Sequence, residues 1–273
     1  MTTTGTGAGA GREARNALIL LLPLAGAALV WETVSRTGVI DRQFLPPPST
    51  IAETMYGLLA PTSEGISRLG LHLGRSLIRL FGGFALGVFG GVILGLLMGA
   101  SRGVAWFLTP VVTLVMSVPV IALVPLLTLW LGIGDAPIVA AVCIATFFPV
   151  VYNTFNGVRG VNRMVIWATE TMGAGPRTIF VRVLFPASLA SILTGLKLGL
   201  GMAWRTLVGA EMLIATSWGL GSMIFVARNF LNVAVMFAGI VTLAVVGFVL
   251  EQYVFNLVER RTVERWGLVT RAD

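Results

Sequence analysis

The chain has 273 residues, of which 56% are hydrophobic and only 11% are charged, and its net charge is +7. A soluble domain carries about 25% charged residues on its surface, so this composition excludes a soluble protein and predicts an integral membrane protein. Its long apolar runs do not alternate with period two, which favours helices over a barrel. The excess of arginine fits loops that face anionic headgroups, so we expect a lipid membrane as partner and no nucleic acid.

The chemistry of an enzyme site is absent from the sequence. No GxxxxGK[ST] motif occurs, so ATP binding by a P-loop is not expected in this chain. The only histidine, His72, has no Cys/His cluster or carboxylate pair to accompany it, which argues against a metal site and a catalytic triad. The only cysteine, Cys143, lies in an apolar run and is expected to be a small core residue. The sequence therefore predicts no cofactor, no metal and no enzyme activity in this chain.

Hydropathy divides the chain into a flexible cytoplasmic tail (residues 1–15), a transmembrane domain (16–257) and a basic cytoplasmic tail (258–273). An even number of spans places both termini on one side, and most arginines fall on the side that we predict to be cytoplasmic. The expected fold is an all-α membrane protein of six transmembrane helices with both termini in the cytoplasm. The predicted spans cover approximately residues 16–34, 77–100, 104–131, 138–155, 187–214 and 233–257.

An outer linker, residues 35–68, separates the first two predicted spans. It contains LPPPST at residues 45–50, whose prolines favour an extended entry. Ser49 or Thr50 can then cap a short amphipathic helix over residues 51–59. We expect this helix to lie along the outer membrane surface.

The second predicted span carries a stripe of glycines with a spacing of four. Each glycine lowers helix propensity by about 1 kcal/mol, so a whole stripe needs a structural reason. Small residues at this spacing allow helix backbones to approach closely in lipid. The stripe therefore predicts a helix-packing seam, in which the helices either slide or pack statically. Its members are Gly83, Gly87, Gly91, Gly95 and Gly99.

Prolines interrupt the third and fourth predicted spans. Pro110, Pro119 and Pro125 are expected to kink the third span, and Pro149 to break the fourth. GIGDAP, at residues 132–137, is expected to form the outer turn between them. Because kinked helices often border a moving path, Pro119 and Pro125 are candidates for the translocation path.

Residues 161–186 form the longest interior segment that is poorly suited to lipid. They predict one short helix over 163–172, a left-handed turn at Gly173 and Gly175, and a second helix over 177–184 that Pro186 ends. Two short helices around a glycine turn form a compact plug with exposed apolar residues, which fits a groove on a partner. The alternative is an ordinary interfacial loop.

Three charged residues lie within the fifth predicted span, namely Lys197, Arg205 and Glu211. Ionisable residues inside a membrane bundle are functional candidates, and all three are candidates for the translocation path. Lys197 lies near the inner end, where its side chain can reach the headgroups. Arg205 and Glu211 are six residues apart and face different sides of the helix, so Arg205 either pairs with another span or lines an anion path. Glu211 is a candidate for the outer gate or for bundle packing. Residues 216–232, which follow this span, are expected to form a polar outer loop.

The segment 161–186 resembles the signature cytoplasmic loop of permease subunits of bacterial ABC importers. That loop reads E-A-A, three residues, G, nine residues, then I-x-L-P. Gly173 takes the glycine position, and the last three defined positions are taken by Val183, Phe185 and Pro186. Trp167 stands where the family has its leading glutamate, and the nearest acid, Glu170, follows about one helical turn later.

Further blocks resemble the aliphatic sulfonate, taurine, nitrate and bicarbonate subgroup of these permeases, in the same order along the chain. The similarity extends over approximately residues 45–261. The blocks that carry it are residues 45–50, 117–137, 147–161, 192–204, 210–221 and 227–230.

The resemblance implies a type I ABC importer permease in a bacterial inner membrane that works as a homodimer, with the path at the interface between two copies. It also implies two cytoplasmic ATPase subunits, which bind ATP and Mg²⁺, and an extracytoplasmic solute-binding protein. The solute would be a small anion such as a sulfonate, taurine or nitrate. The coupling helices within residues 161–186 would dock the ATPases through Arg163, Trp167, Glu170, Gly173, Gly175, Arg177 and Pro186.

Two other classes of protein remain as alternatives. One is a secondary transporter of small anions driven by an ion gradient, which usually shows internal repeats and paired broken helices that we do not find here. The other is a structural membrane scaffold, for which Arg205→Ala would leave all transport unchanged while assembly fails.

Overall fold

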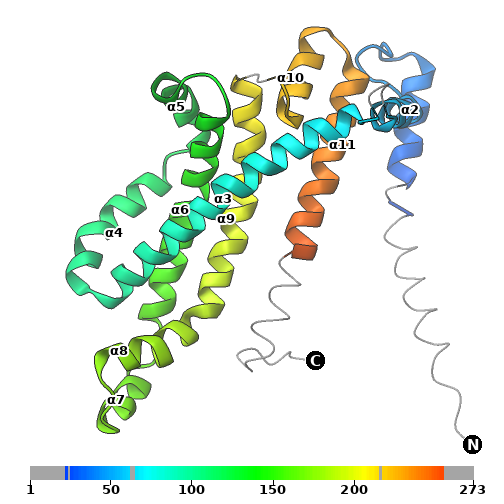
Figure 1. The fold of residues 1–273 in the computed structure, drawn as a ribbon. Helices are drawn as coiled ribbons and strands as arrows, with labels where there is room; N and C mark the ends of the chain where they lie inside the picture. Colours follow the sequence, from blue (N-terminus) through cyan, green and yellow to red (C-terminus); the bar gives the residue numbers. More distant parts are fainter. Residues whose placement is uncertain (1–21, 24, 62–64, 215–216, 255–273) are drawn as a thin grey trace, which may run out of the picture.

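The computed structural model describes residues 22–23, 25–61, 65–214 and 217–254. The all-helical prediction is confirmed for this part of the chain, which contains no strand beyond an isolated bridge between Pro61 and Ser67. Residues 25–37 are helical and precede the named elements (Figure 1). The α-helices are α2 (Pro48–Leu59), α3 (Arg68–Ala100), α4 (Arg102–Met116), α5 (Val124–Leu131), α6 (Asp135–Arg159), α7 (Arg163–Thr171), α8 (Pro176–Ile179), α9 (Phe185–Ile214), α10 (Leu220–Asn229) and α11 (Val233–Val249). A 3₁₀ turn, η1 (Val120–Leu123), and two π-helical turns, η2 (Phe180–Leu184) and η3 (Leu250–Val254), complete them.

Three long helices, α3, α6 and α9, form the centre of the bundle. α3 crosses α6 and α9 diagonally, and α6 packs between its two partners (Figure 1). Lipid provides no hydrophobic driving force between helices, so close van der Waals packing has to hold them together. The side chains at the centre are accordingly apolar and almost completely buried: Leu80, Ile138, Val142, Leu200 and Leu207.

Four helical stretches of the described chain are long and apolar enough to cross a membrane, and the bent pair α4 and η1–α5 can be counted as a fifth. Of the first predicted span, residues 16–34, the structure describes 22–23 and 25–34, and these residues are helical. The four stretches are Arg68–Ala100, Asp135–Arg159, Pro176–Ile214 and Val233–Gln252.

The third predicted span is not one kinked helix. It divides into α4 and the η1–α5 segment, which are bent by 87° relative to each other. The break lies at Pro119, which has an extended backbone with φ −61° and ψ 116°. Proline lacks an amide hydrogen and disfavours helix at the residue before it, so α4 ends at Met116 and η1 begins only after Pro119.

Three further sequence predictions are corrected by the structure. α6 continues through Pro149, because a packed bundle tolerates the loss of one helical hydrogen bond. Pro186 does not end a helix either, since Pro176–Ile214 is one continuous helical stretch. The π-helical turn η2 directly precedes Pro186, and its shifted hydrogen bonds accommodate the missing amide hydrogen. The predicted outer loop over residues 216–232 contains helix α10, which is largely buried.

The five glycines of the stripe on α3 face α6. A Cβ atom added to Gly83 would lie 2.7 Å from the Val139 carbonyl oxygen and from Val142 Cβ of α6. At Gly95 it would lie 2.8 Å from the Val151 carbonyl oxygen. Side chains at these positions would therefore force the two backbones apart. We refer to Gly83, Gly87, Gly91, Gly95 and Gly99 as the glycine seam.

Candidate functional site

A helical hairpin, α7 and α8, projects from one end of the bundle (Figure 1). Asn162 caps α7 by accepting a hydrogen bond from the Met164 amide at 2.9 Å. Gly173 has φ +82°, the left-handed conformation that glycine adopts without a steric penalty, and it reverses the chain between the two helices. Pro176 occupies the first turn of α8, where its missing amide hydrogen is not needed.

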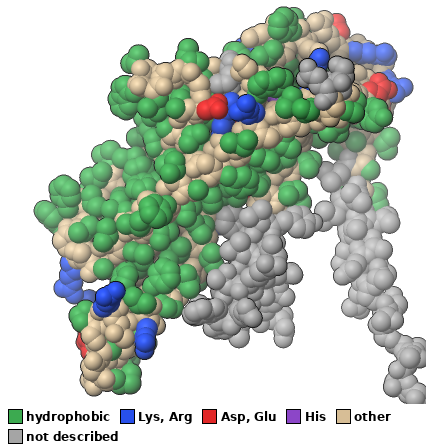
Figure 2. Space-filling model, viewed as in Figure 1, with side chains coloured by type: hydrophobic (Ala, Val, Ile, Leu, Met, Phe, Trp, Pro, Cys, Tyr) green, Lys and Arg blue, Asp and Glu red, His purple; other side chains and the backbone are tan. Residues whose placement is uncertain are grey.

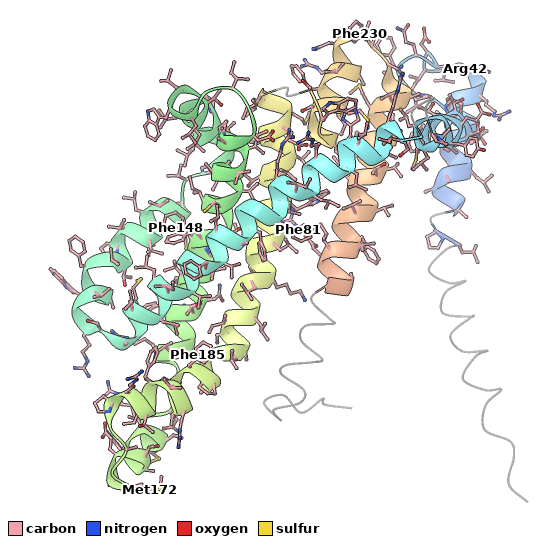
Figure 3. The ribbon with its side chains drawn as sticks, in the orientation of Figure 1. Arg42, Phe81, Phe148, Met172, Phe185 and Phe230 are labelled. Atoms are coloured by element: carbon pink, nitrogen blue, oxygen red, sulfur yellow. The ribbon has the colours of Figure 1, made fainter. Side chains whose placement is uncertain are left out.

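The tip of this hairpin exposes large apolar side chains. Trp167 is 58% exposed and Met172 is 77% exposed, and Met172 lies at the far end of the molecule (Figure 3). Lys and Arg side chains, in blue, lie near the base of the hairpin in Figure 2. Glu170 lies one turn beyond Trp167, is exposed, and forms no ion pair within the described residues. The hairpin therefore exposes large apolar side chains next to charged ones.

A cavity of about 360 Å³ lies at the break between α4 and η1, bordered by α6 and α9. Pro119 lines it from the break, and Arg205 and Thr206 line it from α9. Two of the predicted path residues, Pro119 and Arg205, therefore meet at one site. Their neighbours in the cavity wall are mainly apolar, so the Arg205 guanidinium is the only charged group among the lining residues.

Arg205 has a partner on another helix. Its Nη2 lies 3.2 Å from Glu251 Oε1 in the π-helical turn η3. Both side chains are open, with Arg205 72% exposed and Glu251 41% exposed. Lys197 and Pro125 are also exposed, but neither is among the residues that line the cavity.

Glu211 is completely buried in a polar network at the other end of α9. Its carboxylate accepts hydrogen bonds from Arg79 Nη1 at 2.7 Å, from Ser76 Oγ at 2.9 Å and from the Gly221 amide at 2.9 Å. Arg79, only 4% exposed, also donates through Nε to Asp135 Oδ1 at 2.9 Å. This buried network joins α3, α6, α9 and the start of α10. Of the two roles predicted for Glu211, its position corresponds to bundle packing.

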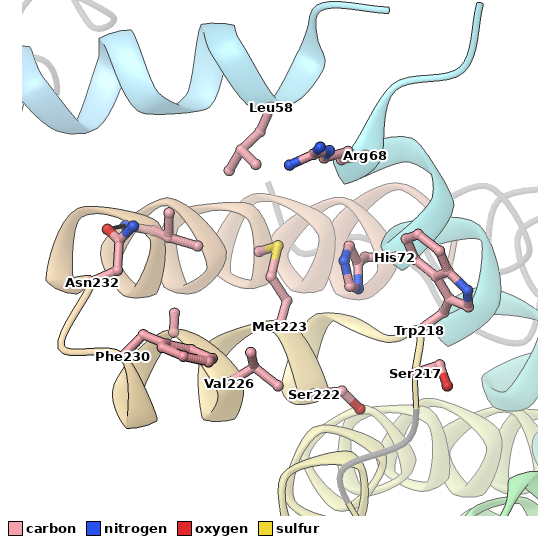
Figure 4. Close-up of a pocket in the computed structure, with 12 residues that line it drawn as sticks. Leu58, Arg68, His72, Ser217, Trp218, Ser222, Met223, Val226, Phe230 and Asn232 are labelled. Carbon is pink, nitrogen blue, oxygen red and sulfur yellow. Dashed lines mark hydrogen bonds between the residues drawn. The ribbon is translucent and has the colours of Figure 1, made fainter. Parts of the chain in front are cut away.

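An open groove of about 590 Å³ lies beside the buried network, between α2, α3, α10 and α11 (Figure 4). His72 Nδ1 is 2.8 Å from the Gly219 carbonyl oxygen, and the His72 ring packs against Trp218 with ring centroids 5.0 Å apart. Phe230 and Met223 form apolar walls, and Arg68 adds a positive charge at the rim. The groove and the α7–α8 hairpin lie at opposite ends of the bundle (Figure 1).

Several residues of these sites were missed from the sequence. Ser76, Arg79 and Asp135 belong to the buried network, and Glu251 pairs with Arg205. One sequence pattern could have revealed part of the network: the helical face that carries the glycine seam continues towards the start of α3. Positions 72, 76, 79 and 83 fall on one helical face, so His72, Ser76 and Arg79 extend the buried stripe with polar groups. Asp135 and Glu251 carry no comparable local pattern.

The crossed long helices, the broken span and the projecting hairpin define a polytopic membrane protein of the permease type. A family model described as "Binding-protein-dependent transport system inner membrane component" matches residues 87–263. The chain belongs to this family. Membership confirms the resemblance found in the sequence and makes the chain a multi-pass transport permease subunit rather than an enzyme.

Two relatives come from different bacteria. The taurine transport system permease protein TauC of Escherichia coli is 36% identical over 228 residues, which cover 84% of this chain and 82% of TauC. The putative aliphatic sulfonates transport permease protein SsuC of Bacillus subtilis is 36% identical over 245 residues, which cover 90% of this chain and 86% of that protein. Among solved structures, the inward-facing MetNI methionine ABC transporter matches with a TM-score of 0.58. That match covers 70% of this chain and 94% of the MetNI chain at 19% identity, so it supports the fold alone.

Proposed function

We propose that this chain is the membrane-spanning permease subunit of an ATP-driven ABC importer in a bacterial inner membrane, with six spans and both termini in the cytoplasm. Its solute is a small anion of the sulfonate or taurine type. Support for the solute class comes from the relatives named for taurine and aliphatic sulfonates, and from Arg205 in the wall of the cavity. ATP and Mg²⁺ bind on partner subunits, and the permease provides the path.

The observation that carries this proposal is the projecting α7–α8 hairpin with its exposed Trp167 and Met172. Two ATPase subunits dock on two such hairpins, one from each permease copy. α8, η2 and α9 form one continuous helical stretch, Pro176–Ile214, which runs from the hairpin to the cavity residue Arg205. Closure of the ATPase pair therefore tilts this stretch as a lever and opens the path outward, and ATP hydrolysis resets it.

A second copy of the chain completes the path in this proposal. Lys197, Met202 and Arg205 lie on an exposed face of α9, although α9 lies within a stretch apolar enough to cross a membrane. Charged groups in a membrane face a protein interior or a water-filled cavity, so this face is the one that a partner copy covers. The cavity at Pro119 then opens towards the interface between the two copies.

The solute-binding protein docks at the other end of the bundle. The groove beside Trp218 and Phe230 combines aromatic walls with the positive charge of Arg68, which suits contact with another protein. This end is opposite to the α7–α8 hairpin (Figure 1). The proposed function requires this arrangement, because the solute is delivered from outside the cell and the ATPase subunits act from inside.

The test is reconstituted uptake of taurine in vesicles that contain the permease, its ATPase subunits and its solute-binding protein. We expect uptake only with ATP on the side of the ATPase subunits, and we expect it to continue when proton and sodium gradients are dissipated. Uptake without ATPase subunits, or uptake that stops with the gradients, would favour a secondary transporter instead. Unchanged uptake by an Arg205→Ala variant would favour the scaffold alternative for this face of α9.

A further inference from the structure

The two ion pairs of α9 differ in whether a solute anion can replace the carboxylate of the pair. The Arg79–Glu211 pair is 4% and 0% exposed, and its groups are held by further fixed donors and acceptors. The Arg205–Glu251 pair is 72% and 41% exposed and consists of one contact at 3.2 Å. A single open contact of this kind leaves the Arg205 guanidinium accessible to a competing anion.

The position of Glu251 is set by a close approach of α11 to α9. A Cβ atom added to Gly247 would lie 2.7 Å from Trp204 Nε1, so Gly247 lets the two helices touch. Glu251 follows Gly247 by one turn, and its Oε1 would lie 3.1 Å from a Cβ atom added to Gly201. Gly201 therefore leaves room on α9 for the Glu251 carboxylate.

Arg205 lies between this carboxylate and the cavity. It follows Gly201 by four residues and Met202 by three, so it shares a helical face with both. Gly201 faces Glu251, whereas Met202 and Thr206 line the cavity. The guanidinium thus has two sites within its reach, one at the Glu251 carboxylate and one in the cavity.

Neither charge is favourable alone in a membrane-spanning stretch. Arg205 belongs to Pro176–Ile214 and Glu251 to Val233–Gln252, and both stretches are apolar enough to cross a membrane. An unpaired arginine there is costly, so an empty cavity favours pairing with Glu251, and an anion in the cavity offers an alternative partner.

We propose that Glu251 is a resident counter-ion of Arg205, which a solute anion displaces when it enters the cavity and which returns when the anion leaves. Glu251 is therefore a positioning residue that sets how tightly the permease itself holds an anion. This inference rests on the proposed role of Arg205 in the translocation path.

The experiment measures binding of radiolabelled methanesulfonate, a simple sulfonate anion, to the permease–ATPase complex in nanodiscs. The solute-binding protein is omitted so that only the affinity of the permease is read, and ionic strength is fixed. We expect Glu251→Gln to lower the Kd about fivefold, which is the upper range for an exposed ion pair. In the double variant Arg205→Gln with Glu251→Gln, we expect the gain in affinity to disappear. Glu53→Gln on exposed α2 removes the same charge elsewhere and should leave the Kd unchanged.

The outcomes separate this inference from the proposed function. If the Glu251→Gln complex binds methanesulfonate no more tightly than the wild-type complex, the counter-ion role is wrong. The same conclusion holds if neither complex binds methanesulfonate detectably. If Arg205→Gln leaves both methanesulfonate binding and taurine uptake unchanged, the path role of Arg205 itself fails. Co-purification with the ATPase subunits checks assembly of each variant. Should Glu251→Gln fail to assemble, Gly201→Ala crowds the carboxylate without changing any charge and should lower the Kd in the same direction.

Discussion

Arg79 and Arg205 are the same residue type in opposite surroundings. Arg79 is buried between Glu211 and Asp135, and its Nε, Nη1 and Nη2 atoms all contact fixed carboxylates. A solute cannot compete for these donors without unpairing buried charges. Arg205 keeps most of its surface open and has one partner at 3.2 Å. Because Arg79 is buried, it stabilises the packing of the helices, whereas the exposed Arg205 can still contact an anion.

The buried network gives a prediction about stability. Arg79→Met leaves the Glu211 carboxylate buried without its cation, and removal of one partner from a buried pair costs about 3–5 kcal/mol. We expect a large fall in the melting temperature of the purified complex, measured by thermal unfolding in one detergent. Arg75→Met changes an exposed arginine one turn earlier on the same helix and should alter the free energy of unfolding by less than about 0.5 kcal/mol.

The double variant Arg79→Met with Glu211→Gln tests the same mechanism. It removes both buried charges, so most of the lost stability should return. A double variant as unstable as Arg79→Met alone would show that the arginine acts through packing and not through its charge.

Glu170 gives a second prediction for a single residue. The family position one turn earlier is occupied by Trp167, so Glu170 is the acid available on this face of α7. We expect Glu170→Gln to weaken co-purification of the ATPase subunits by about threefold to sixfold, since an exposed ion pair contributes up to about 1 kcal/mol. Glu53→Gln is the matched control on exposed α2. Equal recovery of ATPase with both variants would mean that Trp167 and its apolar neighbours dock without an acid.

Among the elements, the glycine seam between α3 and α6 offers a comparison of two adjacent positions. Gly83 faces α6, where a Cβ atom would lie 2.7 Å from the Val139 carbonyl oxygen, whereas Gly82 has no atom within 4 Å of such a Cβ. We expect Gly83→Ala to destabilise the protein by about 1–3 kcal/mol through overpacking. Gly82→Ala should be neutral or stabilise it by up to about 1 kcal/mol through helix propensity. Thermal unfolding of both variants measures the difference, and equal melting temperatures would contradict close packing at the seam.

Local patterns predicted the helices that contain strong periodicity or clear turn residues. The glycine spacing of four predicted a seam, and a left-handed turn was expected at Gly173 and Gly175. Gly173 has φ +82°, as expected, whereas Gly175 has φ −73° and an extended backbone, so the prediction for Gly175 is wrong.

Prolines were less informative, because their effect depends on the surrounding packing. Pro119 breaks its helix with an 87° bend, whereas Pro149 and Pro186 lie within continuous helices. Of the other prolines predicted to kink the third span, Pro110 lies inside α4 and Pro125 lies in the first turn of α5, so the residue type alone did not show where the helix breaks.

Partners far apart in the sequence could not be predicted. Arg79 and Glu211 are separated by 132 positions, and Arg205 and Glu251 by 46. Each of these residues is a single charge inside an apolar run, and its partner depends on how the helices cross. The sequence identified Arg205 and Glu211 as charges that need partners, but only the packing of α3, α9 and α11 determines which partners they have.

At the scale of the whole molecule, the α7–α8 hairpin and the helices that border the groove, α2, α10 and α11, lie at opposite ends of the bundle (Figure 1). The stretch Pro176–Ile214 is continuous from α8 to Glu211 of the buried network. In the proposed mechanism, a displacement of the hairpin would be transmitted along this one helical stretch to the cavity and then to the network beside the groove. A rigid connection of this kind predicts that a defect in the hairpin turn changes coupling between the ends more than it changes stability.

Gly173→Val tests this prediction. Gly173 has φ +82° and no neighbour within 4 Å of an added Cβ, so valine would strain only the backbone, by about 1–2 kcal/mol. We expect a complex that still inserts and assembles but hydrolyses ATP without taurine uptake. The measurement is the ratio of solute transported to ATP hydrolysed in reconstituted vesicles.

Gly38→Val is the matched control, because Gly38 has φ +74° and the same open surroundings in the linker before α2. It imposes a similar backbone strain at the other end of the molecule, so it should lower stability to a similar extent while the transport ratio stays unchanged. If both variants reduce the ratio equally, general destabilisation explains the effect and the hairpin has no special role in coupling. If Gly173→Val transports normally, the turn geometry of the hairpin is not needed for coupling, because the α7–α8 surface then docks without a fixed angle between its helices.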